Sequence, residues 1–208
     1  MRFEITDRVS PAGFARITGG FYVAFIATSV LADALGHIGL GDTVQVHDAI
    51  TTRPQTFRAA LVVAFVSAFL FLMAAWGLYV VLRGVDHNLA LLFLLLNAAG
   101  VAVQCASMLG LVWAFTLGDP GLGPTALGQS QTDTLVRAGI DTYRTGFVIA
   151  QLFFGTWLFP LGLLVYRSGL LPRILGVLLL LDGVAELVWF TQALLLPTHP
   201  GIRTPGTA

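Results

Sequence analysis

The feature that most constrains the fold is an apolar stretch, Arg173–Pro197, that carries two acidic residues. A membrane-spanning helix needs about 20 mostly apolar residues, and this stretch is long enough. Asp182 and Glu186 stand one helical turn apart within it, so they share one face of the helix. A carboxylate near the centre of a bilayer costs about 2.5–3.5 kcal/mol on insertion scales. We therefore expect protein, water, a proton or a ligand to face this pair.

The composition indicates that the bilayer is the solvent of this chain. Of its 208 residues, 56% are hydrophobic and 11% are charged, whereas a soluble domain carries about 25% charged residues. The eleven basic residues balance eleven acidic ones, which excludes the basic surface that nucleic-acid binding requires. A single cysteine, Cys105, excludes an intrachain disulfide and a cysteine-based metal cluster.

The apolar runs predict an all-α polytopic bundle of five transmembrane helices. We expect residues 1–15 to form a polar lead-in and residues 198–208 a flexible tail. The segment between the first two spans has the composition of a polar loop, and residues 135–140 that of a short interfacial helix. Within the membrane domain, residues 16–197, the expected spans are about 16–35, 56–82, 89–117, 141–166 and 173–197.

The arginines give a weak signal for orientation. Six of them lie on the side of the N-terminus and five on the other side. The very short turns at Arg83 and Arg167 favour a cytoplasmic N-terminus under the positive-inside rule.

All five spans contain polar residues whose insertion into hydrocarbon costs free energy. We expect these residues in one half of the membrane, away from the N-terminus. Trp157 and Trp189 would flank this group. It consists of Asp33, Arg58, Gln104, Arg144, Gln151, Asp182 and Glu186.

This cluster has two interpretations. In the first it is a structural network, in which Arg58 and Arg144 neutralise the acids while Asn97 and the two glutamines form interhelical hydrogen bonds. In the second it is a pocket open to the far side that admits a ligand, an ion or a proton, because ionisable residues within a membrane mark functional sites. Three acids against two arginines leave one carboxylate without a cation, and a protonated acid in an apolar pocket can act as a general acid.

Other sequence patterns give less evidence for a functional site. The spacing of His37, His47 and Asp48 matches no metal-binding motif, so we expect no metal and no cofactor. Gly19 and Gly20 form a small face that predicts close helix packing.

Three segments resemble a known family. They are ARITG at Ala15–Gly19, LRGVDHNLALL at Leu82–Leu92 and YRSGLLPRILGVLL at Tyr166–Leu179. Together they resemble the domain-of-unknown-function 4386 family of bacterial integral membrane proteins, over about Ala15–Pro197. The resemblance implies an all-helical fold in a bacterial inner membrane, and it carries over no catalytic residue. Members of the family usually have six spans, so we expect the fifth helix of this chain to leave an open face.

Three functions remain open. The leading hypothesis is a protein that binds a small molecule or lipid in the polar pocket. The second is a structural accessory subunit or homo-oligomer that docks through the fifth helix. The third is an intramembrane enzyme for an apolar, isoprenoid-like substrate, with Asp182 or Glu186 as general acid.

Overall fold

The described part of the chain forms six α-helices, five of which are long and apolar enough to cross a membrane. The computed structural model describes residues 11–119, residue 121 and residues 128–195; the predicted lead-in up to residue 10 and the predicted tail lie outside these ranges. The protein is thus a multi-pass membrane protein. The helices are α1 (Pro11–Gly36), α2 (Thr43–Thr52), α3 (Pro54–Leu82), α4 (His87–Gly118), α5 (Gln129–Ser168) and α6 (Arg173–Leu195).

Local sequence signals mark where the helices begin and end. Asp42 caps α2, because its carboxylate accepts a hydrogen bond from the Gln45 N–H at 2.8 Å and the Gln45 side chain accepts one from the Asp42 N–H at 3.0 Å. This reciprocal pair is a capping box. Asp86 caps α4 through the N–H groups of the second and third helical residues. Gly169 ends α5 with φ +64°, a conformation that costs glycine little.

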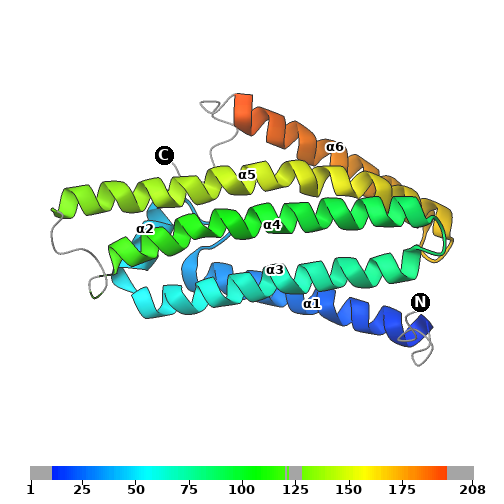
Figure 1. Cartoon of the computed structure of the whole chain (residues 1–208), viewed down its shortest axis with the longest axis horizontal. Coiled ribbons are helices and arrows are strands. Elements are labelled where there is room, and N and C mark those ends of the chain that lie inside the picture. The colour runs from blue at the N-terminus through cyan, green and yellow to red at the C-terminus, as the bar shows by residue number, and fades with distance from the viewer. Residues whose placement is uncertain (1–10, 120, 122–127, 196–208) are drawn as a thin grey trace.

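The five long helices form a curved row in the order α1, α3, α4, α5, α6 (Figure 1). Each packs on its neighbours in the row, most extensively α4 on α5, α1 on α3 and α5 on α6. Among the described residues, α1 and α6 make no contact with each other. The row is therefore open, with α1 and α6 as its two ends.

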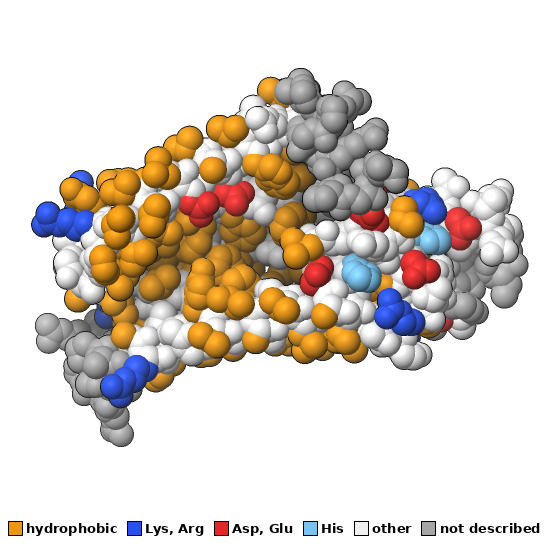
Figure 2. Space-filling view, turned by 180° about the vertical axis from the view of Figure 1, so that it is seen from behind, with side chains coloured by type: hydrophobic (Ala, Val, Ile, Leu, Met, Phe, Trp, Pro, Cys, Tyr) orange, Lys and Arg blue, Asp and Glu red, His pale blue; other side chains and the backbone are white. Residues whose placement is uncertain are grey.

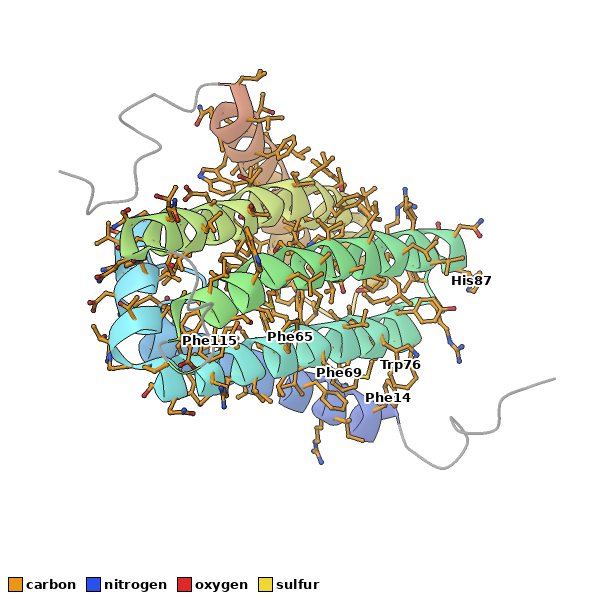
Figure 3. The ribbon with its side chains drawn as sticks, turned by 60° about the vertical axis from the view of Figure 1, so that its left-hand side comes forward. Phe14, Phe65, Phe69, Trp76, His87 and Phe115 are labelled. Atoms are coloured by element: carbon orange, nitrogen blue, oxygen red, sulfur yellow. The ribbon has the colours of Figure 1, made fainter. Side chains whose placement is uncertain are left out.

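Small residues hold neighbouring helices close together. On α5 and α6, Gly155 faces Gly183 and Gly162 faces Gly176, and in both pairs a backbone oxygen of α5 lies within 3.0 Å of where a Cβ on α6 would stand. Such contacts are typical of membrane helix pairs, which gain little from the hydrophobic effect. On α1 and α3, Phe14 packs edge-to-face on Trp76 with ring centroids 5.7 Å apart (Figure 3).

Helix α5 is too long to lie entirely within a bilayer. Its 40 residues extend about 60 Å at 1.5 Å per residue, against about 30 Å of hydrocarbon. Its first turns pack with α2, the start of α3 and the end of α4 around a core that includes Ile50, Phe57, Phe115 and Ile140. We call this end of the molecule the cap; charged side chains gather there in Figure 2.

The structure corrects three expectations. The segment before Pro54 contains helix α2, although its polar composition predicted a loop. Residues 135–140 form no separate helix but belong to α5, which continues through Pro160. Gly19 and Gly20 do not pack on another helix, because a Cβ at either position would meet nothing within 4 Å.

Candidate functional site

A groove of about 1870 Å³ lies between the two ends of the helix row. Helices α1 and α6 form its walls, and the last turns of α3 and the second half of α5 form its floor. Figure 2 shows this concave face, on which apolar side chains surround a hollow between α6 above and α1 below. Because α1 and α6 do not touch, the groove opens sideways, towards the lipid.

The two acids of α6 lie in this groove. Asp182 and Glu186 both line it, and Gln151 of α5 lines it from the floor. Asp182 is exposed and Glu186 half-buried, with its Cβ 3.2 Å from where a Cβ on Gly155 would stand. The three ion pairs formed by the described residues do not include either acid, and no hydrogen bond among those residues reaches either carboxylate.

Asp182 lies well inside α6, away from the turn that precedes this helix. Asp182 follows Arg173, the first residue of α6, by nine positions, which is about 14 Å along the helix axis. This is close to half of the hydrocarbon thickness of about 30 Å. The interfacial end of the groove lies near Arg83 and Leu170, which also line it.

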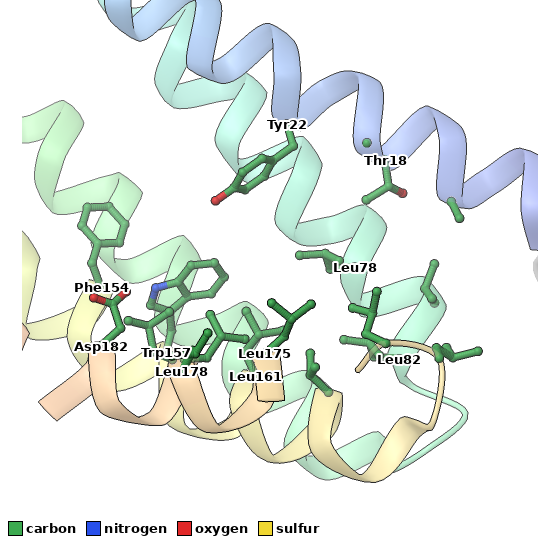
Figure 4. Close-up of a pocket in the computed structure, with 18 of the residues that line it drawn as sticks. Thr18, Tyr22, Leu78, Leu82, Phe154, Trp157, Leu161, Leu175, Leu178 and Asp182 are labelled. Atoms are coloured by element: carbon green, nitrogen blue, oxygen red, sulfur yellow. The ribbon is translucent and has the colours of Figure 1, made fainter. Parts of the chain in front are cut away.

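Aromatic side chains border the acidic end of the groove. Figure 4 shows Tyr22 pointing from α1 into the groove, opposite Phe154 and Trp157 of α5 and Asp182 of α6. Trp157 is buried and its ring packs edge-to-face on Phe71, at a centroid distance of 5.5 Å. The acidic end therefore combines negative charge with aromatic faces, whereas leucines dominate the rest of the lining.

Three of the predicted site residues lie in the cap instead. Asp33 accepts a hydrogen bond from the Leu40 N–H at 3.1 Å. Arg144 donates to the Gly41 carbonyl oxygen at 3.0 Å. Arg58 pairs with Asp119 at 3.8 Å and lies 5.2 Å from the centre of the Phe115 ring.

The observed ion pairs therefore differ from those predicted from the count of acids and arginines. The cations expected for Asp182 and Glu186 are used in the cap, because α3 and α5 carry Arg58 and Arg144 beyond the apolar core towards α2. The predicted pocket also faced away from the N-terminus, whereas the groove runs from the acids towards the end of the bundle where α1 begins.

The remaining predicted residues divide between the groove and other surfaces. The structure brings Gln151, Trp157, Asp182 and Glu186 together, but Gln104 and Trp189 do not line the groove. Gln104 is half-buried on α4, and its backbone carbonyl accepts a hydrogen bond from Ser107 at 2.7 Å. Trp189 is 39% exposed on α6.

Asn97 does not form the interhelical hydrogen bond expected of it. Its side chain is fully buried in α4, and neither amide atom has a hydrogen-bond partner in the described part of the chain. Nor do the described residues include a group of three or more His, Cys, Asp or Glu that could hold a metal ion.

Sequence reasoning missed the wall of the groove that α1 provides. Phe14, Thr18, Gly19 and Tyr22 line it, but in the sequence they resemble any lipid-facing residues of a first span. The only available signal was the small pair Gly19–Gly20, which we interpreted as a packing face. The floor residue Leu78 carried no signal at all.

The comparisons with known proteins identify a family and nothing more specific. No curated protein and no solved structure matches the chain significantly. A family model described as "Domain of unknown function (DUF4386)" matches residues 17–206, which is most of the chain. This match extends from within the first candidate span through the fifth and includes the acidic pair of the groove. The chain therefore belongs to the DUF4386 family of membrane proteins.

Proposed function

We propose that the protein binds a small amphipathic or apolar molecule in the lateral groove between α1 and α6. The observation that carries this proposal is the position of Asp182 and Glu186, which lie in an apolar groove without a partner among the described residues. A lipid-facing carboxylate near mid-bilayer costs about 2.5–3.5 kcal/mol. A ligand that met the acids with a polar group would offset that cost.

The groove has room for the apolar part of a membrane-soluble molecule. Ligand pockets commonly measure about 300–1,000 Å³, and the groove is larger, at about 1870 Å³. Its lining is mostly leucine, valine and aromatic side chains, with few polar groups. A membrane-soluble molecule would reach it sideways from the bilayer, without crossing water.

We further propose that the protein resides in a bacterial inner membrane with the start of α1 on the cytoplasmic side. The turns between α3 and α4 and between α5 and α6 lie at the same end of the bundle as the start of α1 (Figure 1). Arg16, Arg83, Arg167 and Arg173 lie at or near this end. Basic residues in short loops favour the cytoplasmic side.

A second candidate function has support from α6. Only Gly176 and Gly183 of this helix are buried, and both face α5. Exposed side chains of α6 outside the groove, such as Val177, Val184 and Val188, could contact a helix of another membrane protein, as those of an accessory subunit would. Ligand binding remains the first proposal, because a partner helix would have to leave two carboxylates against its own apolar surface.

The test is photolabelling with an alkyl probe that carries a diazirine, in nanodiscs of phosphatidylcholine. Gly19 lines the groove and a Cβ there meets nothing within 4 Å, so the side chain of Gly19→Phe has room to enter the groove. Gly20→Phe is the matched control, since Gly20 is equally open but does not line the groove.

We expect label on peptides of α1, α5 and α6 in the native protein. Gly19→Phe should lower this labelling by about fivefold, the ratio that corresponds to about 1 kcal/mol of lost contact between the probe and the groove. Gly20→Phe should leave it unchanged. Equal labelling of both variants would refute the groove as a binding site.

A further inference from the structure

We infer that the ligand of the groove is a compact hydrophobic amine, whose ammonium group meets Asp182 and Glu186. This inference rests on the proposed function and names the chemical class that the site selects. Three properties of the site lead to it: the sign of the charge, the aromatic surroundings and the depth.

The described chain offers no cation to the two carboxyl groups at the deep end of the groove. Asp182 and Glu186 stand one turn apart on α6, and all three ion pairs of the described residues lie elsewhere. The one basic residue that lines the groove, Arg83, belongs to its interfacial end. A cation in the low dielectric of the groove would be attracted far more strongly than in water.

The aromatic side chains favour the same class of ligand. Tyr22, Phe154 and Trp157 line the groove together with the acids, from α1 and α5 (Figure 4). An ammonium group is attracted to the face of an aromatic ring, more strongly where water is excluded. A neutral or anionic headgroup would gain neither this attraction nor the ion pair.

The depth distinguishes a compact amine from an ordinary lipid. Asp182 lies about 14 Å along α6 from its first residue, close to mid-bilayer. The headgroup of a phospholipid stays at the interface and does not reach that level. A single-chain or ring-shaped amine can place its ammonium group there, with its apolar part along Leu161, Leu175 and Leu178.

The experiment compares two photoreactive probes of equal chain length, a primary amine and the corresponding alcohol, in phosphatidylcholine nanodiscs at neutral pH. Half-maximal labelling of α1 and α6 peptides should need about tenfold less amine than alcohol, the ratio that one favourable charge pair readily supplies. The double variant Asp182→Asn with Glu186→Gln should abolish this advantage, so that the amine and the alcohol label at similar half-maximal concentrations. Asp48→Asn, which removes one acid of α2 in the cap, is the control for a loss of charge outside the groove and should preserve the advantage.

The outcomes separate this inference from the proposed function. If both probes label the groove equally, the amine inference is wrong and the groove remains a binding site. An amine advantage that survives in the double variant also overturns the inference, because it would reflect membrane charge alone. If neither probe labels α1 and α6, or if the two helices crosslink to a second copy instead, both proposals fail.

Discussion

The backbone oxygen of Gly162 lies 2.7 Å from where a Cβ on Gly176 would stand, so helices α5 and α6 meet at their backbones. In the opposite direction, a Cβ on Gly162 would stand 2.9 Å from the oxygen of Gly176. This contact positions α6 as the last helix of the row and turns its acidic face towards the groove. The site therefore depends on two residues that have no functional groups.

The first prediction concerns this contact. Gly176→Leu should lower the free energy of unfolding by about 1–3 kcal/mol, because the new side chain overlaps backbone that cannot move aside. Denaturation in detergent would measure the change. Gly20→Leu adds the same side chain where a Cβ meets nothing and should leave stability nearly unaltered. Equal stability of the two variants would argue against close backbone packing.

The second prediction concerns the buried amide of α4. Asn97→Leu should raise the free energy of unfolding by about 1–3 kcal/mol, the cost of leaving a buried polar group unpaired. Neither of its amide atoms has a hydrogen-bond partner among the described residues. The same denaturation assay applies, with Asn97→Asp as a variant that should destabilise. A loss of stability in Asn97→Leu would contradict a buried amide without hydrogen-bond partners at this position.

The third prediction concerns the ion pair that joins α3 to the end of α4 in the cap. A double-mutant cycle of Arg58→Ala and Asp119→Asn should give a coupling energy of about 0.2–1 kcal/mol, because Arg58 is half exposed. Arg58→Ala alone should cost more than the coupling, since the guanidinium also lies over Phe115. Additive effects of the two substitutions would show that the pair contributes nothing.

The fourth prediction concerns the turn between α1 and α2. Arg144→Met should increase hydrogen exchange in residues 37–42, because it removes the side-chain hydrogen bond to the Gly41 carbonyl oxygen. Arg137→Met removes an exposed arginine of the same helix without a contact to this turn, and exchange there should stay the same. Exchange that responds equally to both substitutions would point to a general effect of charge.

Much of the fold could be predicted from the sequence, because hydropathy and length report directly on membrane spans. The five spans and the all-α class are confirmed. Helix α2 was missed because the segment is polar overall, although its capping box, Asp42 with Gln45, was a readable signal. The extension of α5 was missed because its first turns are polar overall, whereas they pack in the cap around the core that includes Ile140.

The candidate site was only partly predictable. The free-energy cost of placing Asp182 and Glu186 in a membrane could be derived from the sequence, and so could their position on one face of the helix. Their environment could not, because it depends on which helices neighbour α6 and which end the row. Distance along a helix placed Arg58 and Arg144 in the same half of the membrane as the acids. The structure instead places both arginines in the cap, whereas Glu186 lies beside Gly155, further along α5.

The most direct test of the central claim is the fluorescence of Trp157 in bilayers whose lipid chains carry bromine. Trp76, Trp113 and Trp189 are first replaced by phenylalanine, which leaves Trp157 in the groove as the only tryptophan. If the groove opens to the membrane between α1 and α6, brominated chains will quench this tryptophan. Gly19→Phe will then reduce the quenching and Gly20→Phe will not. Absence of quenching, or quenching that both glycine variants leave unchanged, would contradict an open groove at the acidic pair.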